Sequence, residues 1–220
     1  MANYRRKLPR IEWGTDRQLF RYRVGDDVAA KGGVFARAST ANYFDASGIL
    51  QTAAVDVLRD AHYIAGVRHA LLEPAATNLL LHSRDFTNAA WSKTNATIVP
   101  NSVLAPNNAF EADEIQATAA AATLCIQQKN ATATAMVFSA FVRRGSGATD
   151  ANKFAIHNNT TGLTVASVAL NYDTGVLSVT AGSGRVVPLT GLFAGWYWVQ
   201  CWATTGITIG NSLNVYVAFA

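Results

Sequence analysis

The feature that most constrains the fold is a run of short alternating segments that fills the second half of the chain. Apolar and polar residues alternate there, and clusters of Asn, Gly, Pro and Asp, such as Pro106–Asn108 and Asp173–Gly175, interrupt the alternation. A period of two is typical of half-buried β-strands, and closely spaced turn signals favour an antiparallel sandwich over a parallel sheet. The predicted strands are 95–99, 110–117, 121–128, 134–144, 153–158, 163–172, 176–181, 185–189, 196–204 and 213–219.

The composition agrees with a folded, β-rich chain. Half of the 220 residues are apolar and 15% are charged, so the chain has enough apolar surface to bury a sizeable core. The sequence has no apolar run long enough to span a bilayer and no apolar segment behind its N-terminal charges. We therefore expect neither membrane insertion nor a signal peptide.

The basic residues are concentrated in the leading segment. Residues 1–37 contain nine Lys/Arg and four Asp/Glu, whereas residues 38–220 contain nine and ten. We predict that residues 1–36 form an extended basic arm that becomes ordered on a protein partner. A disordered leader is the alternative. A nucleic-acid partner is not expected, because the arm has no dense run of Lys/Arg. The predicted docking residues are Arg5, Arg6, Lys7, Trp13, Phe20 and Tyr22.

Residues 37–91 predict a hairpin and a connecting segment. Apolar and polar residues alternate over 37–53, and Asp45-Ala-Ser-Gly48 has the composition of a tight turn. A short helix or turn is expected over 54–63, a strand over 77–81, and a loop around Phe86 and Trp91. The predicted domains are therefore the arm 1–36, the hairpin and connecting segment 37–91, and a β-sandwich over 92–220.

The two cysteines, Cys125 and Cys201, lie in alternating apolar segments. Two buried, reduced thiols are the favoured interpretation, and a disulfide is the alternative. His62 and His69 have no Cys or carboxylate at metal-site spacing, so we expect no metal site. No cofactor-binding motif is present in the sequence.

The segment 195–202, Gly-Trp-Tyr-Trp-Val-Gln-Cys-Trp, is the richest in aromatic residues. In a strand, even positions would place Trp196, Trp198 and Trp202 on one face, opposite Tyr197 and Val199. Three roles for the Trp face remain open: sandwich core, subunit interface, or a platform on which glycans stack.

No sequence pattern indicates catalysis. The chain lacks a nucleophile elbow, an HExxH motif, a phosphate-binding loop and a paired-carboxylate signature. Glu111, Asp113 and Glu114 fall within one predicted strand, where they are expected to form a solvated edge. Arg143 and Arg144 are expected to mark the end of a strand. We therefore expect no catalytic residues and no enzymatic activity.

Several motifs resemble bacteriophage virion proteins. The run Arg37-Ala-Ser-Thr-Ala-Asn-Tyr43-Phe-Asp45-Ala-Ser-Gly48 is followed by Leu72-Glu-Pro-Ala-Ala-Thr-Asn-Leu-Leu80 and by Phe86-Thr-Asn-Ala-Ala-Trp91. These runs resemble tail-fibre, tailspike and head-fibre proteins, as do Asn171–Gly175 and Gly195–Tyr197. This chain lacks the Gly-Trp-Gly-x-Gln-Leu-Glu strand that commonly closes the domain in that family. The domain either lacks that strand, receives it from a partner chain, or belongs to a longer product.

The resemblance implies a jelly-roll sandwich similar to carbohydrate-binding modules and lectins. It also implies a structural virion subunit, assembled in the bacterial cytoplasm as a homotrimer and attached by its arm to other virion proteins of the tail, portal-neck or capsid. Two alternatives remain open: a module that binds host surface glycans, and a capsid decoration or cement protein.

Overall fold

The computed structural model describes residues 36–64, 67–71, 78–119, 123–145 and 152–219. The chain divides into two compact units, Met1–Ala76 and Thr77–Ala220. We call the described part of the first the hairpin unit and that of the second the sandwich unit. The predicted arm, 1–36, lies outside the described residues except for its last position.

The hairpin unit consists of two antiparallel hairpins. Strand β1 (Ala41–Phe44) pairs with β2 (Leu50–Ala53), and β3 (Arg59–Ile64) pairs with β4 (Val67–Leu71). The hairpin predicted over 37–53 is confirmed. The helical alternative over 54–63 is wrong, because the chain turns through residues 55–56 and then enters β3. Asp56 has a φ of 59°, a left-handed conformation that interrupts any helix at the turn.

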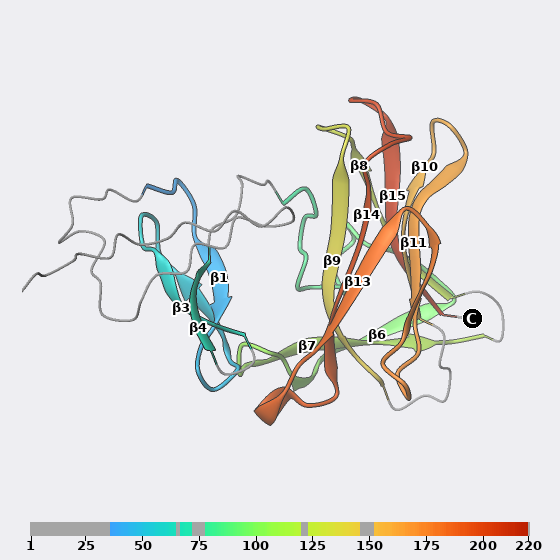
Figure 1. The fold of residues 1–220 in the computed structure, drawn as a ribbon. Helices are drawn as coiled ribbons and strands as arrows, with labels where there is room; N and C mark the ends of the chain where they lie inside the picture. The colour runs from blue at the N-terminus through green and yellow to red at the C-terminus, as the bar shows by residue number, and fades with distance from the viewer. Residues whose placement is uncertain (1–35, 65–66, 72–77, 120–122, 146–151, 220) are drawn as a thin grey trace, which may run out of the picture. The chain divides into compact units, whose positions relative to one another are not determined.

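The sandwich unit is built from antiparallel sheets (Figure 1). One sheet has the strand order β12-β11-β10-β15-β8-β5, and a second has the order β13-β14-β9. The strands of the first are β5 (Ser92–Thr94), β8 (Thr123–Asn130), β10 (Asn152–Asn158), β11 (Leu163–Leu170), β12 (Leu177–Ala181) and β15 (Ser212–Phe219). Those of the second are β9 (Met136–Arg143), β13 (Ser183–Pro188) and β14 (Trp196–Ala203).

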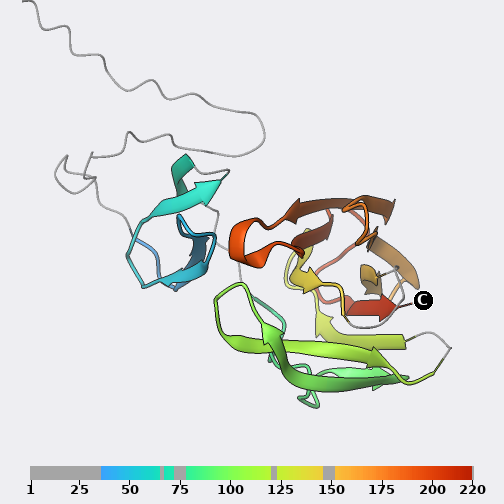
Figure 2. The ribbon, with the colours of Figure 1, turned by 90° about the horizontal axis from the view of Figure 1, so that it is seen from below.

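A long hairpin completes the unit. Its strands are β6 (Ala96–Leu104) and β7 (Phe110–Ala117), and Figure 2 shows it in green as a two-stranded ribbon. A short 3-10 turn, Gly191–Phe193, precedes β14. Within the described parts of the chain, no helix is long and apolar enough to cross a membrane.

The core lies between the six-stranded and three-stranded sheets. In β14 from Val199 to Ala203, and in β15 from Leu213 to Val217, every second residue is buried, as the period of two predicts. Phe154 and Ile156 of β10 are buried with Val199 and Cys201 of β14, and Leu213 of β15 belongs to the same cluster. A mainly β, antiparallel sandwich is therefore confirmed, and each predicted strand from 95 onward overlaps an observed one.

The predicted hairpin and connecting segment, 37–91, included residues 78–91. In the structure these residues belong to the compact unit that contains the sandwich. The strand predicted over 77–81 is wrong for its described residues, which have no regular structure and then turn. The buried side-chain amide of Gln127 instead holds this segment. It donates to the carbonyl of Leu81 at 2.8 Å and accepts from the Leu81 N–H at 2.7 Å.

Candidate functional site

Arg37 joins the beginning of the hairpin unit to the turn after β2. Its Nε donates to the carbonyl of Ser39 at 2.6 Å, and one terminal nitrogen donates to the carbonyls of Ala53, at 3.2 Å, and Ala54. The backbone N–H of Arg37 donates to Asp56 Oδ1 at 2.8 Å, and the Asp56 N–H donates to the Arg37 carbonyl at 3.1 Å. A guanidinium has five donors in a rigid planar group, so one side chain can hold several carbonyls.

Asp45 organises the turn of the first hairpin. Its Oδ1 accepts hydrogen bonds from the N–H groups of Ser47 (2.9 Å) and Ile49 (3.0 Å), and Oδ2 accepts from Gln51 Nε2 at 2.8 Å. Desolvation alone would raise the pKa of Asp45, but the hydrogen bonds from Ile49, Gln51 and Ser47 outweigh it and lower the pKa. Gly48 closes the turn at a φ of 76°, which glycine adopts without strain.

Arg59 and His62 of the hairpin unit form hydrogen bonds with its backbone. Arg59 is 5% exposed and donates to the carbonyl of Asn42 at 3.0 Å. His62 Nδ1 accepts a hydrogen bond from the Phe44 N–H at 3.1 Å, and its backbone is paired with that of His69. In the described ranges, no group of three or more His, Cys, Asp or Glu side chains could hold a metal ion.

Strand β14 separates two environments. Its inward residues are Val199, Cys201 and Ala203, all buried in the sandwich core. Its outward residues Trp198 and Trp202 are partly exposed, whereas Trp196 is only 6% exposed. The structure therefore places two of the three predicted Trp side chains where a ligand or partner could contact them.

The neighbouring strands extend this outward surface in three rows. The first row is Val187, Trp198 and Phe141; the second is Arg185, Gln200 and Ser139; the third is Ser183, Trp202 and Val137. We call these nine residues the aromatic face. Gly184 and Val186 of β13 lie on the opposite side: Val186 packs on the core, and a Cβ on Gly184 would lie 2.4 Å from a methyl carbon of Val168.

The indole of Trp198 is fixed by its neighbours on β9. Its Nε1 donates to Ser139 Oγ at 2.6 Å, and its ring stacks on Phe141 with the ring centroids 6.1 Å apart and the planes at 27°. Because the indole N–H donates to Ser139 of the neighbouring strand β9, the orientation of the Trp198 ring is fixed. An aromatic surface that is already ordered loses little side-chain entropy on binding.

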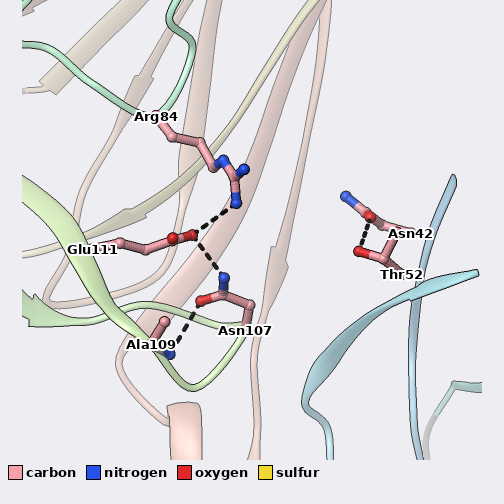
Figure 3. Close-up of polar contacts among 6 residues, drawn as sticks. All are labelled: Asn42, Thr52, Arg84, Asn107, Ala109 and Glu111. Carbon is pink, nitrogen blue, oxygen red and sulfur yellow. Dashed lines mark hydrogen bonds and ion pairs between the residues drawn. The ribbon is translucent and has the colours of Figure 1, made fainter. Parts of the chain in front are cut away.

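The predicted acidic edge has a structural role in the sandwich unit. Glu111 Oε1 forms an ion pair with Arg84 Nη1 at 3.1 Å and accepts from Asn107 Nδ2 at 2.6 Å, and Asn107 Oδ1 accepts from the Ala109 N–H (Figure 3). Figure 3 also shows the Asn42–Thr52 contact across the first hairpin.

The other two acids of this group, Asp113 and Glu114, also accept hydrogen bonds within the sandwich unit. Asp113 accepts hydrogen bonds from the N–H groups of Phe86 at 2.8 Å and Asn101 at 3.1 Å, and Glu114 Oε2 is bonded to Ser102 Oγ at 3.2 Å. Together with Glu111, these carboxylates fix the 78–91 segment and the β6–β7 hairpin.

The two thiols are buried and free, as the sequence indicated. Burial raises the pKa of Cys201 to about 12, and burial raises that of Cys125 to about 11, against an opposing effect of Lys93. Because the thiolate is the reactive form of cysteine, neither thiol is suited to nucleophilic chemistry near neutral pH.

Of the nine residues of the aromatic face, only Trp198 and Trp202 were predicted as site residues. Apart from the two serines, the residues not predicted are Val137, Phe141, Arg185, Val187 and Gln200. Period-two alternation places Phe141 and Arg185 on strands. It does not state which strands are neighbours or in what register, so the rows could not be assembled from sequence. The predicted docking residues of the arm, Arg5 to Tyr22, lie outside the described residues.

Comparisons with known proteins find no matching protein-family model, no matching curated protein and no matching solved structure.

Proposed function

We propose that this chain is a structural, non-enzymatic subunit of a bacteriophage virion, part of a fibre or spike. In this proposal the arm, residues 1–36, docks on the tail, portal-neck or head, and the β-sandwich projects outward. The charge distribution supports the proposal, because the basic excess of the chain lies entirely in the arm.

The observation that carries the proposal is how the motif residues are used. Arg37, Asp45 and Gly48 are the residues through which the chain most clearly resembles virion proteins, and each has a defined role in the hairpin unit. A motif whose members build one small unit is a structural signature rather than a set of reacting groups. That unit would serve as the joint between the arm and the sandwich.

Deletion of residues 1–36 tests the proposal. We expect the truncated chain to keep a folded sandwich, measured by circular dichroism and cooperative thermal unfolding, while its incorporation into virions is lost. A matched control replaces only the basic residues Arg5, Arg6 and Lys7 by Gln, which should reduce incorporation without removing the arm. Normal incorporation of the truncated chain would refute the anchoring role.

The resemblance to fibres also implies a homotrimer, because three copies can cover apolar sheet surfaces that one copy exposes. Light scattering of the full chain at micromolar concentration should then give the mass of three chains. A monodisperse monomer under those conditions would contradict this part of the proposal.

Glycan binding by the sandwich is a second candidate function, and the aromatic face favours it. Trp198 and Trp202 are partly exposed on the same side of β14, with polar side chains between them. Small-molecule sites commonly combine aromatic surface with a few fixed polar groups. Loss of cell binding in Trp198→Ala, with no loss of virion incorporation, would separate this role from the structural one.

A further inference from the structure

We propose that the aromatic face of β9, β13 and β14 is a contact surface between copies of this chain. In a three-fold ring it meets residues 176–181 of the next copy, which we call the β12 edge. The inference rests on the structural role proposed above and on the homotrimer expected with it, and it names the surfaces through which the copies associate. It gives the Trp residues a subunit-interface role in place of the glycan role.

The outward surfaces of the two sheets differ in polarity. On the six-stranded sheet, Ser212 and Asn214 of β15 are paired in register with the exposed Asn130 and Gln128 of β8. On the three-stranded sheet, five of the nine residues of the aromatic face are Trp, Phe or Val. An antiparallel sheet with one face on the core is commonly solvated on the other, so an apolar outward surface indicates a partner.

Polar side chains of the aromatic face are already engaged within the chain. The Trp198 indole N–H donates to Ser139 Oγ at 2.6 Å, and Arg185 also interacts within the chain. Groups that already have partners can be covered by apolar side chains without loss of a hydrogen bond. The amide of Gln200 is partly exposed and can bond across a contact, and protein interfaces carry about one hydrogen bond per 100–200 Å².

The face is open to solvent but small for a stable contact on its own. Val137 is 56% exposed beside the partly exposed Trp202, and the longest strands of the sheet have eight residues. Three such strands, about 4.8 Å apart with about 3.3 Å per residue, cover roughly 380 Å². A standard interface takes about 800 Å² from each partner. A two-fold contact through this face alone therefore falls short, whereas a ring gives each copy two contact surfaces.

The β12 edge is a second apolar surface next to this face. β12 is an end strand of the six-stranded sheet, and Val176 and Val179 are 58% and 47% exposed. Only Gly182 separates β12 from β13, so the edge adjoins the aromatic face. Gly182 has a φ of 64°, and a Cβ there would lie 2.5 Å from the carbonyl oxygen of Trp202. Glycine therefore fixes the bend between the two surfaces.

A ring of three copies brings non-identical surfaces together. Each copy would present its aromatic face to one neighbour and its β12 edge to the other, so like groups do not face each other. Residues 176–181 carry no charge, so the arginine of the face meets no like charge across the contact. A fixed angle between the two surfaces is what allows such contacts to close into a ring instead of extending into a filament.

The first experiment measures the mass of the full chain at micromolar concentration by sedimentation and light scattering. We expect three chains. Val137→Asp would bury an unpaired charge in the contact, and Trp202→Ala would remove an aromatic anchor, so each should raise the dissociation constant roughly tenfold or more. Asn130→Asp is the matched control: it adds the same charge at an exposed position of the other sheet and should stay trimeric. Thermal unfolding establishes that each variant is folded.

The second experiment identifies which surfaces meet. Cys125 and Cys201 are buried, so thiols introduced on the surface react selectively. The double variant Val137→Cys and Val179→Cys, treated with a short flexible bis-maleimide, should form chains linked to one another, whereas each single variant should stay unlinked. No link in the double variant would overturn the assignment of the β12 edge. A link in Val137→Cys alone would show that two identical faces meet and would overturn the ring.

The outcomes separate this inference from the proposed function. A monomeric full chain that still enters virions would overturn the inference and leave the structural role standing. A trimer unchanged in Val137→Asp and Trp202→Ala would leave the homotrimer standing and overturn the assignment of the face. A monomer whose cell binding is lost in Trp198→Ala would assign the face to a glycan and overturn the inference. A trimer that Val137→Asp dissociates, in a chain that does not enter virions, would support the inference and overturn the proposed function.

Discussion

The hairpin unit and the sandwich unit are both antiparallel β-structures, but different interactions hold them together. Among the residues of the hairpin unit whose exposure is described, the buried ones are Ala53 and the charged Arg59. The sandwich unit buries a cluster of large apolar side chains, among them Phe154, Ile156 and Leu213. A small unit cannot bury enough apolar area to be stable on that basis alone, so side-chain hydrogen bonds to the backbone contribute a larger share there.

This difference explains where the recognisable motif lies. Replacing one apolar residue of a core by another of similar volume costs little, so a core tolerates many sequences. A guanidinium that reaches the carbonyls of Ser39, Ala53 and Ala54, and a carboxylate that accepts two backbone N–H groups, cannot be exchanged in that way. The motif in 37–48 therefore reflects structural requirements of the hairpin unit.

The largest effect is expected in the sandwich core. Phe154→Ala removes a side chain that is 2% exposed and lies near Phe138, so the sandwich should lose about 3–5 kcal/mol of unfolding free energy. Urea unfolding followed by tryptophan fluorescence measures this loss, since four of the five Trp lie in this unit. Amide signals of the hairpin unit should stay dispersed; their loss in the same transition would show that the two units unfold as one.

The next largest effect is expected at Arg37. Arg37→Ala removes its guanidinium hydrogen bonds and should cost the hairpin unit roughly 1–3 kcal/mol, with the sandwich unaffected. Hydrogen exchange of the amides in β1 and β2 measures the change. Arg37→Lys is the matched variant, and it should restore little, because an ammonium lacks the planar fork. Full rescue by Lys would show that charge, rather than geometry, is what matters.

A smaller and pH-dependent effect is expected at Asp45. Its pKa is lowered in the folded state, so its stabilising contribution is present above the unfolded-state value near 3.8 and is lost as the pH falls through the lower folded value. Exchange rates of the turn amides should therefore rise in acid. In Asp45→Asn this acid dependence should disappear, and an unchanged acid profile in that variant would assign it to another group.

The smallest effect is expected at the Arg84–Glu111 ion pair. The Arg84 side chain is 77% exposed, so Arg84→Ala should change the unfolding free energy of the sandwich by less than about 1 kcal/mol. Urea unfolding at low and high salt measures it. A loss comparable to that of Phe154→Ala would contradict the view that the sandwich is stabilised mainly by its apolar core.

The sequence predicted local structure well where alternation of apolar and polar residues, or the residues of a tight turn, determines it. Period-two alternation and turn residues located the first hairpin and the strands from β6 to β15. They failed where contacts distant in sequence decide the outcome. Residues 78–81 have strand-like composition, yet Asn78 Oδ1 accepts from the Leu80 N–H and the side chain of Gln127 takes the place of a neighbouring strand at Leu81.

The sequence by itself determined that Trp196, Trp198 and Trp202 would alternate with buried residues, because side chains of a strand point to opposite faces in turn. Only the tertiary structure decided that Trp196 is covered while the other two remain partly exposed, and that Arg185 and Phe141 stand beside them. The physical reason is that alternation is a property of one strand, whereas a face is made by strand order and register.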